Sequence, residues 1–369
     1  MSKIGILTFH GSHNYGSMLQ AYALQKCLKS SGHQVMIINL RNKNNKILYA
    51  FPFDIKKRGK RLVLLSCKHI FRTYKECKTW FLFEHFLSEF YHLTDKTYES
   101  WQEIKNDLAN LNFDAIITGG DQIWNMRCYD FDISYFLPEK LNGIKKISYC
   151  PSMGGKFLSI INEKEKEFII SCLRDYNCIS VREEMMKTFL TPYLKSDIKV
   201  VVDPTMLLKK EDYLSLIKEK PLIKEKYVFY YSPWKNEEAE EIALHIGGKM
   251  GLKVVCSQNL DCKGLRHFIT AGPCEFLNLF KHAEYVIGKS FHLIVFSLLF
   301  HKQFLAINGI DDFRMRNILE KYGLEQRGKA TIGNCLQIIN NRIEFAKVDF
   351  IMEQERKESI SFLHNLLTT

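Results

Sequence analysis

The stretch that decides the fold is residues 4–40, IGILTFHGSHNYGSMLQAYALQKCLKSSGHQVMIINL. It opens with an apolar run at residues 4–9, continues through a polar, glycine-containing loop into a helical pattern at residues 18–28, and closes with a second apolar run at residues 35–40. Two short apolar runs joined by a helix are typical of parallel strands with a crossover connection. The stretch therefore predicts an α/β domain built on a parallel sheet.

The same alternation continues along the rest of the chain. Further strands are predicted in the first part at residues 115–118, 146–149, 178–181 and 199–202. After Asp203-Pro204-Thr205 a second series predicts strands at residues 227–231, 252–256, 285–288 and 303–307, and helices at residues 237–250, 274–282 and 293–300. We therefore predict two Rossmann-like α/β domains in tandem, residues 1–205 and 206–369, whose last helix could pack back on the first domain. Paired domains of this kind often bind ligands in the cleft between them.

A region of different composition, residues 43–110, interrupts the first domain and reads as a helical insertion. Residues 56–78 contain nine Lys or Arg and one Glu, and Phe83, Phe86, Leu87 and Phe90 follow at helical spacing. A basic segment beside an aromatic helical face can lie on an anionic membrane surface. The alternative is a solvated lid whose apolar stripe packs on its own domain, as on any docked helix.

The composition limits the possible cellular environments and binding partners of the protein. The 369 residues carry a formal net charge of +11, which favours phosphorylated metabolites, nucleic acid or acidic lipid headgroups as partners. The eleven cysteines show neither CxxC pairs nor zinc-ligand spacing, so we expect reduced thiols and no metal. The start MSKIGILTFH reads as a strand rather than a signal peptide, and the apolar run at residues 293–300 is too short to span a bilayer. We expect a soluble, cytoplasmic protein that could touch a membrane at its periphery.

In parallel α/β domains, ligands gather beyond the carboxyl ends of the strands. The loop after the first strand offers two glycines for close backbone approach and a helix start for an anion. Its candidate binding residues are Ser12, Asn14, Tyr15 and Gly16. The loop is neither a Walker loop nor a GxGxxG fingerprint, and a plain turn would explain it equally well.

A second loop follows the predicted strand at residues 115–118. Gly119, Gly120 and Trp124 suit the edge of a sugar or nucleotide, and Asp121 could hold a hydroxyl or instead cap a following helix.

Charged candidates follow other strands. Arg182 stands at a strand end, where a guanidinium can bind carboxylate or phosphate, or can pair with the neighbouring glutamate. His292 opens an apolar helix behind Lys289 and Ser290, a place suited to proton transfer, although a lone histidine is often structural. Arg314 lies one strand and one loop after His292. It could bind the same carboxylate or phosphate as Arg182, or it could be a surface charge.

Taken together, five segments in this order resemble the polysaccharide pyruvyl transferase family. They are GSHNYGSMLQAYAL (residues 11–24), ITGGDQIWN (117–125), ISVREE (179–184), VVDPTMLL (201–208) and YVIGKSFHLIVFSLLFHKQFLAI (285–307). The resemblance touches both predicted domains and implies an architecture similar to that of type-B glycosyltransferases. It places the family histidine on His292 and the family arginine on Arg182. The family's later basic residue falls near position 312, which is aspartate here, so Arg314 is its nearest counterpart.

The resemblance implies a reaction. Phosphoenolpyruvate would be the donor and a saccharide the acceptor, with or without a lipid link, and the product would be a pyruvate ketal on a cell-surface polysaccharide or its precursor. Arg182 and Arg314 would hold the donor, His292 would transfer protons, and Asp121 would accept a proton from the sugar or hold its hydroxyls. No cofactor or metal is expected. The order and spacing of these segments give no indication of oligomeric state.

Two other functions fit parts of the sequence. A nucleotide-sugar glycosyltransferase of the same architecture could use Lys289 and His292 on a diphosphate. A nucleic-acid-binding scaffold would rest on residues 56–78 alone, and no zinc-finger, RNP or helix-turn-helix signature accompanies them. We therefore expect no nucleic-acid partner.

Overall fold

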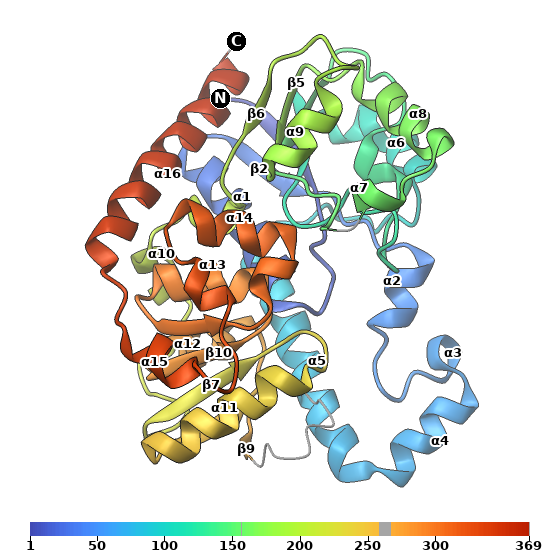
Figure 1. Ribbon diagram of the computed structural model, residues 1–369. Helices are drawn as coiled ribbons and strands as arrows, with labels where there is room; N and C mark the ends of the chain where they lie inside the picture. The colour runs from blue at the N-terminus through green and yellow to red at the C-terminus, as the bar shows by residue number, and fades with distance from the viewer. Residues whose placement is uncertain (156, 258–266, 369) are drawn as a thin grey trace. The chain divides into compact units, whose positions relative to one another are not determined.

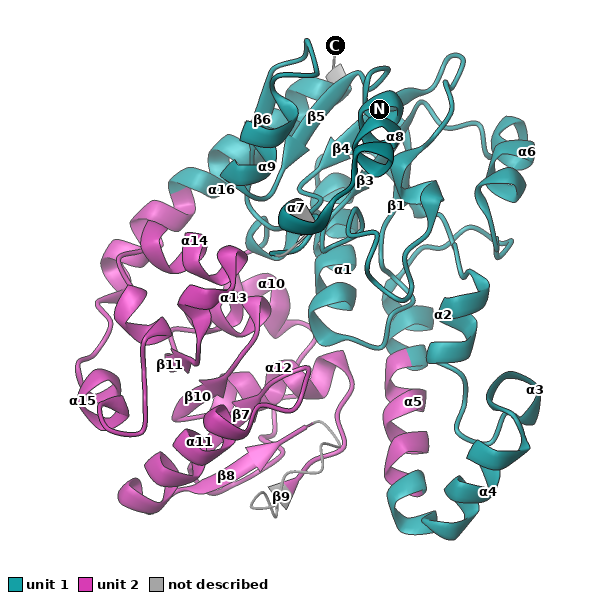
Figure 2. Cartoon of the chain, turned by 45° about the vertical axis from the view of Figure 1, so that its right-hand side comes forward, with its two compact units in different colours: residues 1–73, 84–208, 354–369 teal, residues 74–83, 209–353 magenta. Residues whose placement is uncertain are grey.

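The structure is a computed structural model that describes residues 1–155, 157–257 and 267–368, and Figure 1 shows its elements. The chain divides into two compact units, residues 1–73, 84–208 and 354–369 in one and residues 74–83 and 209–353 in the other (Figure 2). Helices α5 (Ile70–Phe90) and α16 (Phe345–Thr368) contribute residues to both. Within the described ranges, no helix combines the length and apolarity that a membrane crossing needs.

The first unit is built on a six-stranded parallel sheet of order β2-β1-β3-β4-β5-β6. Its strands are β1 (Lys3–Leu7), β2 (Gln34–Ile37), β3 (Ala115–Gly119), β4 (Lys145–Tyr149), β5 (Cys178–Val181) and β6 (Ile198–Val200). All five residues of the central strand β3 are buried, as expected for a strand covered on both faces. The α/β class and the parallel sheet predicted from the sequence are confirmed.

Helices and short 3-10 turns connect these strands. They are α1 (Tyr15–Ser30), α6 (Trp101–Leu111), η1 (Ile133–Phe136), α7 (Phe157–Ile160), α8 (Glu163–Leu173), α9 (Glu184–Leu190) and η2 (Pro204–Met206). Helix α1 begins three residues before the predicted start, because the Asn14 side chain caps it by accepting hydrogen bonds from the N–H groups of Gly16 (2.9 Å) and Ser17 (3.2 Å).

The predicted insertion is helical. It contains α2 (Lys43–Leu48), α3 (Ile55–Arg58), α4 (Lys60–Lys68), the long α5 and nearly all of α6. The aromatic stripe is a packed face, since Phe86 is buried and both Phe86 and Phe90 contact the Tyr22 ring of α1, with centroids 6.0 and 6.2 Å away. The aromatic stripe therefore packs on its own domain, which is the second of the two interpretations that the sequence allowed.

The second unit carries a five-stranded parallel sheet of order β11-β10-β7-β8-β9. Its strands are β7 (Tyr227–Tyr231), β8 (Lys253–Cys256), β9 (His267–Phe268), β10 (Tyr285–Gly288) and β11 (Gln303–Ala306). Around them lie α10 (Lys210–Leu214), α11 (Glu237–Met250), α12 (Pro273–His282), α13 (Phe291–Leu299), η3 (Gly309–Asp311), α14 (Phe313–Lys321), η4 (Glu325–Gly328) and α15 (Cys335–Asn340). The second tandem Rossmann-like series is thus confirmed, with β9 as a strand that the sequence did not predict.

The end of α16 belongs to the first unit. The Ser359 hydroxyl accepts a hydrogen bond from the Val202 N–H at 3.2 Å, and Arg356 Nε donates to the Met206 carbonyl at 2.8 Å. These bonds tie the last helix to the segment that follows β6.

Candidate functional site

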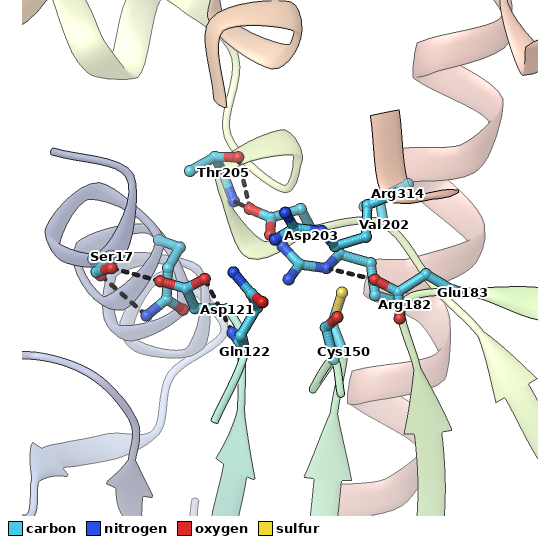
Figure 3. Close-up of polar contacts among 12 residues, drawn as sticks. Ser17, Asp121, Gln122, Cys150, Arg182, Glu183, Val202, Asp203, Thr205 and Arg314 are labelled. Carbon is cyan, nitrogen blue, oxygen red and sulfur yellow. Dashed lines mark hydrogen bonds and ion pairs between the residues drawn. The ribbon is translucent and has the colours of Figure 1, made fainter. Parts of the chain in front are cut away.

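One candidate region lies in the first unit, beyond the carboxyl ends of β1, β3, β4 and β5. Asp121 follows β3 directly and is buried, and its carboxylate accepts a hydrogen bond from the Ser17 hydroxyl at the start of α1 (Figure 3). The Gln122 N–H donates to the same carboxylate at 2.8 Å, and the Asp121 carbonyl accepts from Ser152 N–H at 2.8 Å. Asp121 is therefore fixed in position by three contacts.

No helix starts behind Asp121, so the capping alternative is wrong. Residues 121–124 form a turn, and Asp121 itself has a left-handed backbone with φ of 51°. Non-glycine residues rarely adopt this conformation, and strain of this kind is found more often at functional sites.

The glycine pair before Asp121 is needed for internal packing. A Cβ atom at Gly119 would overlap the Tyr149 carbonyl oxygen, and one at Gly120 would overlap the Gln20 side chain. Gly120 also has φ of 69°, which favours glycine. The closest neighbours at these two glycines are thus protein atoms; a substrate contact there stays a prediction.

The prediction that Trp124 contacts substrate is wrong. Its side chain has 0% exposure, its Nε1 donates to the Tyr135 carbonyl at 3.0 Å, and its ring stacks on Phe136 at 5.4 Å. Sequence reasoning placed Trp124 in a loop, but the turn at residues 121–124 directs it into the core.

A second buried carboxylate, Asp130, was missed by the sequence analysis. It accepts hydrogen bonds from the Ser12 hydroxyl at 2.7 Å and from the Tyr49 hydroxyl at 3.3 Å. Burial raises the pKa of Asp130, and the nearby charge of Asp121 adds to the rise. Ser12, predicted as a binding residue, therefore orients this carboxyl group. No spacing signal marks Asp130 or Tyr49, which lie 81 residues apart.

Arg182 sits at the end of β5 between two carboxylates. Its Nε donates to Glu183 at 3.2 Å, and its Nη1 donates to Asp203 at 2.8 Å, with all three side chains buried (Figure 3). Burial by itself would lower the pKa of Arg182, but the charges of Glu183 and Asp203 outweigh it and raise that pKa. The ion pair with glutamate considered from the sequence is real, although it is buried rather than on the surface.

Asp203 joins two sequence motifs. Besides Arg182 it accepts hydrogen bonds from the Thr205 N–H at 3.0 Å and the Thr205 hydroxyl at 2.7 Å. The segments ISVREE and VVDPTMLL are thus held together by one ion pair and its hydrogen bonds. The Arg182 guanidinium is thus engaged by two buried carboxylates.

A separate candidate region lies in the second unit, where β10 leads into α13. Ser290 precedes the helix in an extended conformation and forms no capping hydrogen bond with its side chain, and Lys289 is partly exposed. His292 is the second helical residue, 6% exposed, with its ring 5.4 Å from that of Phe291 in an edge-on arrangement. All nine residues of α13 are buried, so its N-terminal N–H groups and positive dipole end are backed by an apolar wall.

Arg314 follows η3 and is paired. Its Nε and Nη2 donate to the two carboxylate oxygens of Asp312, at 3.1 and 2.7 Å, and Asp312 also caps α14 through the Arg314 N–H at 3.0 Å. Burial would raise the pKa of Asp312, but its bonds with Arg314 lower it overall. The aspartate at position 312 therefore neutralises the residue taken as the donor-binding arginine.

Lys289 differs from both arginines. The ion pairs among the described residues of the second unit use other cations, and none involves Lys289. Arg182 belongs to the first unit and His292 to the second, and their action on one substrate stays a prediction. In the described ranges no three His, Cys, Asp or Glu side chains are grouped as metal ligands.

The two parallel sheets and their helices define a two-unit α/β protein with the fold class of type-B glycosyltransferases. Within this class the chain belongs to the polysaccharide pyruvyl transferase family, whose model matches residues 14–311. None of the curated protein sequences compared with the chain matches it.

Solved structures resemble the chain in fold. The putative UDP-N-acetylglucosamine 2-epimerase of Listeria monocytogenes aligns with a TM-score of 0.55 at 10% identity, over 97% of this chain and 90% of its own. The UDP-GlcNAc 2-epimerase of Methanocaldococcus jannaschii gives 0.54 at 13% identity and covers 93% of each chain. The spinosyn forosaminyltransferase SpnP gives 0.50 at 10% identity over the full length of both. At these identities the likeness concerns the fold alone.

Proposed function

We propose that this enzyme transfers the carboxyethylidene unit of phosphoenolpyruvate to two hydroxyls of a saccharide and releases phosphate. The observation that carries the proposal is the family match over residues 14–311, which contains Asp121, Arg182, Lys289 and His292, while Ser12 and Arg314 lie just outside its two ends. The net charge of +11 supports it, because a basic surface steers a small, multiply charged anion toward the protein.

The donor is proposed to bind at the start of α13. Lys289 offers an ammonium group that forms no ion pair within the described ranges, Ser290 offers a hydroxyl, and the helix N-terminus adds N–H donors. Phosphate binds readily to such a combination of helix dipole, backbone N–H groups and lysine. Arg182 and Arg314 already face carboxylates, so we propose that they orient groups around the donor while Lys289 supplies the net positive charge.

His292 is proposed as the proton-transfer group. A proton added to C3 of phosphoenolpyruvate turns C2 into an oxocarbenium-like centre, which the donor's carboxylate partly stabilises. One sugar hydroxyl attacks C2 and loses its proton, and the C2–O bond to phosphate breaks. A second hydroxyl then closes the cyclic ketal. Of the two hydroxyl protons, one balances the proton added to C3 and the other leaves with phosphate.

Asp121 is proposed to accept the proton from the attacking hydroxyl. Its carboxylate is oriented by Ser17 and by the Gln122 N–H, which is the kind of fixed geometry that general bases need. Asp130, held by the Ser12 and Tyr49 hydroxyls, is proposed as a neighbouring group that binds a sugar hydroxyl. The saccharide acceptor, lipid-linked or free, and a cytoplasmic location, where the donor is made, are parts of the same proposal.

The test is a phosphate-release assay with phosphoenolpyruvate and a panel of glycans, followed by mass measurement of the products. We expect phosphate release only with an acceptor, and a product heavier by one carboxyethylidene unit. Nucleotide release from a nucleotide-sugar, with no turnover of phosphoenolpyruvate, would instead make the chain a glycosyltransferase.

Single substitutions test which side chains take part in the reaction. His292→Gln should lower turnover by roughly 10²–10⁴-fold, the usual contribution of a general acid–base group. Lys289→Gln should mainly raise the KM for phosphoenolpyruvate. The controls are His301→Gln, an exposed histidine paired with Asp349, and Lys329→Gln, an exposed lysine of the same unit. A folded His292→Gln protein with full activity would remove the assignment.

A further inference from the structure

Residues 55–73 form a segment of the first unit that combines dense positive charge with exposed apolar side chains. This segment, which we call the basic segment, comprises α3, α4 and the first turn of α5. It contains seven Lys or Arg and no Asp or Glu. Its exposed large hydrophobic side chains are Ile55, Leu62, Leu64, Leu65, Ile70 and Phe71.

Exposed hydrophobic side chains are concentrated in the basic segment. The described part of the chain has nineteen exposed large hydrophobic side chains, and six of them fall within these nineteen residues. Phe71 is 88% exposed and Leu64 is 69% exposed. Apolar side chains scattered singly need no explanation, but a cluster on one small element indicates an interaction surface.

Polar contacts, rather than an apolar core, hold the basic segment together. The Pro52 carbonyl accepts hydrogen bonds from Arg58 Nη1 at 3.1 Å and from the Ser66 hydroxyl at 3.3 Å. The Thr73 hydroxyl donates to the Ser66 carbonyl at 2.9 Å, which ties α5 to α4. Ser66 and Thr73 are the buried residues of this segment, so the folding of α3 and α4 leaves their leucines facing outward.

Figures 1 and 2 both show α3 and α4 beyond α2, on the side remote from the first sheet. The main packing partner of α4 is α3, and that of α3 on its other side is α2. The element is therefore a protrusion of the first unit that can meet a surface without rearrangement of the sheet.

The charge and the apolar side chains together select the partner. A second copy of the chain would bring seven cations against seven others, and nucleic acid would leave the side chains of Leu64 and Phe71 without an apolar environment. An anionic bilayer accepts both, since lysines and arginines meet lipid phosphates while apolar side chains enter the boundary of headgroups and acyl chains. We propose that the basic segment docks this enzyme on an anionic lipid surface. The docking is separate from the proposed chemistry and is tested without phosphoenolpyruvate.

The experiment is co-sedimentation of the full chain with vesicles of phosphatidylcholine, alone or with about one third phosphatidylglycerol. We expect binding to the anionic vesicles only, weakened by added salt. Lys57→Gln/Arg61→Gln should lower the partition coefficient roughly 25-fold, about fivefold for each charge lost. Leu64→Ser/Phe71→Ser should lower it at least tenfold, because two exposed apolar side chains no longer enter the bilayer.

Matched variants keep the proposal falsifiable. Phe350→Ser replaces an aromatic side chain that is 65% exposed, and Lys249→Gln replaces an exposed lysine, both outside the basic segment. These two should bind like the original protein. The proposal is overturned if the original protein ignores anionic vesicles, if the control variants lose as much binding as the others, or if Leu64→Ser/Phe71→Ser dissolves a dimer in size-exclusion chromatography without changing vesicle binding.

Discussion

Replacing Arg182 by methionine tests whether the buried ion cluster is structural. The change keeps an apolar side chain of similar length but leaves Glu183 and Asp203, 5% and 0% exposed, without their cation. Removing one partner of a buried ion pair typically costs about 3–5 kcal/mol, because an uncompensated charge stays in a low dielectric. With two carboxylates affected, we expect a loss at the upper end of that range. Arg182→Lys should lose less, since an ammonium retains the charge but cannot bridge both partners.

The assay is urea unfolding of the full chain, followed by backbone hydrogen exchange in β4 and β5 to report on the first unit. A loss of about 5 kcal/mol corresponds to a fall of roughly 2 M in the urea midpoint, at an m-value of about 2–3 kcal/mol/M. The control is Arg127→Met, which removes a bidentate pair with Glu165 whose arginine side chain is 42% exposed, and should change little. Equal stability of the two variants would refute the reasoning.

Three further predictions concern the first unit and a helix of the second. Asp121→Asn should lower acceptor-dependent phosphate release by roughly 10²–10⁴-fold with near-normal donor affinity, measured by steady-state kinetics. Burial lowers the pKa of His10 from 6.5 to about 4, so the unfolded chain binds a proton at a higher pH than the folded protein does. The free energy of unfolding should therefore fall as the pH drops from 6.5 toward 4, by about 2 kcal/mol between pH 7 and 5. Urea midpoints should show a smaller fall in His10→Asn. Gly120→Ala should cost about 2 kcal/mol or more through its positive φ and its overlap with Gln20. Gly248→Ala, in α11 with no atom within 4 Å of the added Cβ, should instead gain up to about 1 kcal/mol by thermal unfolding.

Much of the fold follows from local patterns. The strands at Cys178–Val181, Tyr227–Tyr231 and Tyr285–Gly288 coincide with their apolar runs, since strands of a parallel sheet covered on both faces are continuously apolar. The start of α1 was misplaced because Asn14 was read as a ligand residue and not as a helix cap. The two-residue strand β9 has no periodic pattern to find; its pairing with β8 defines it.

The site was less predictable, because its contacts join loops that are distant in sequence. Ser12 and Asp130 are 118 residues apart, and Arg182 and Asp203 are 21 apart. Spacing arguments identify which loop a residue occupies but not which way its side chain points, and Trp124 shows the consequence. His292 was placed correctly at the start of α13, because a strand, a short polar link and the apolar run at residues 293–300 leave one arrangement.

The candidate regions of the two units differ in the charges of their side chains. In the first unit, Arg182 is outnumbered by Glu183 and Asp203, and Asp121 and Asp130 add two more acidic groups, so this end of the sheet offers acceptors for protons and hydroxyls. In the second unit, the unpaired Lys289 and the N-terminus of α13 offer donors for an anion. Ketal formation from phosphoenolpyruvate needs both, a basic group for the sugar hydroxyl and a cationic cradle for phosphate. Within the proposed reaction we therefore propose that the acceptor binds at the first unit and the donor at the second, and reciprocal losses in Asp121→Asn and Lys289→Gln would follow from it.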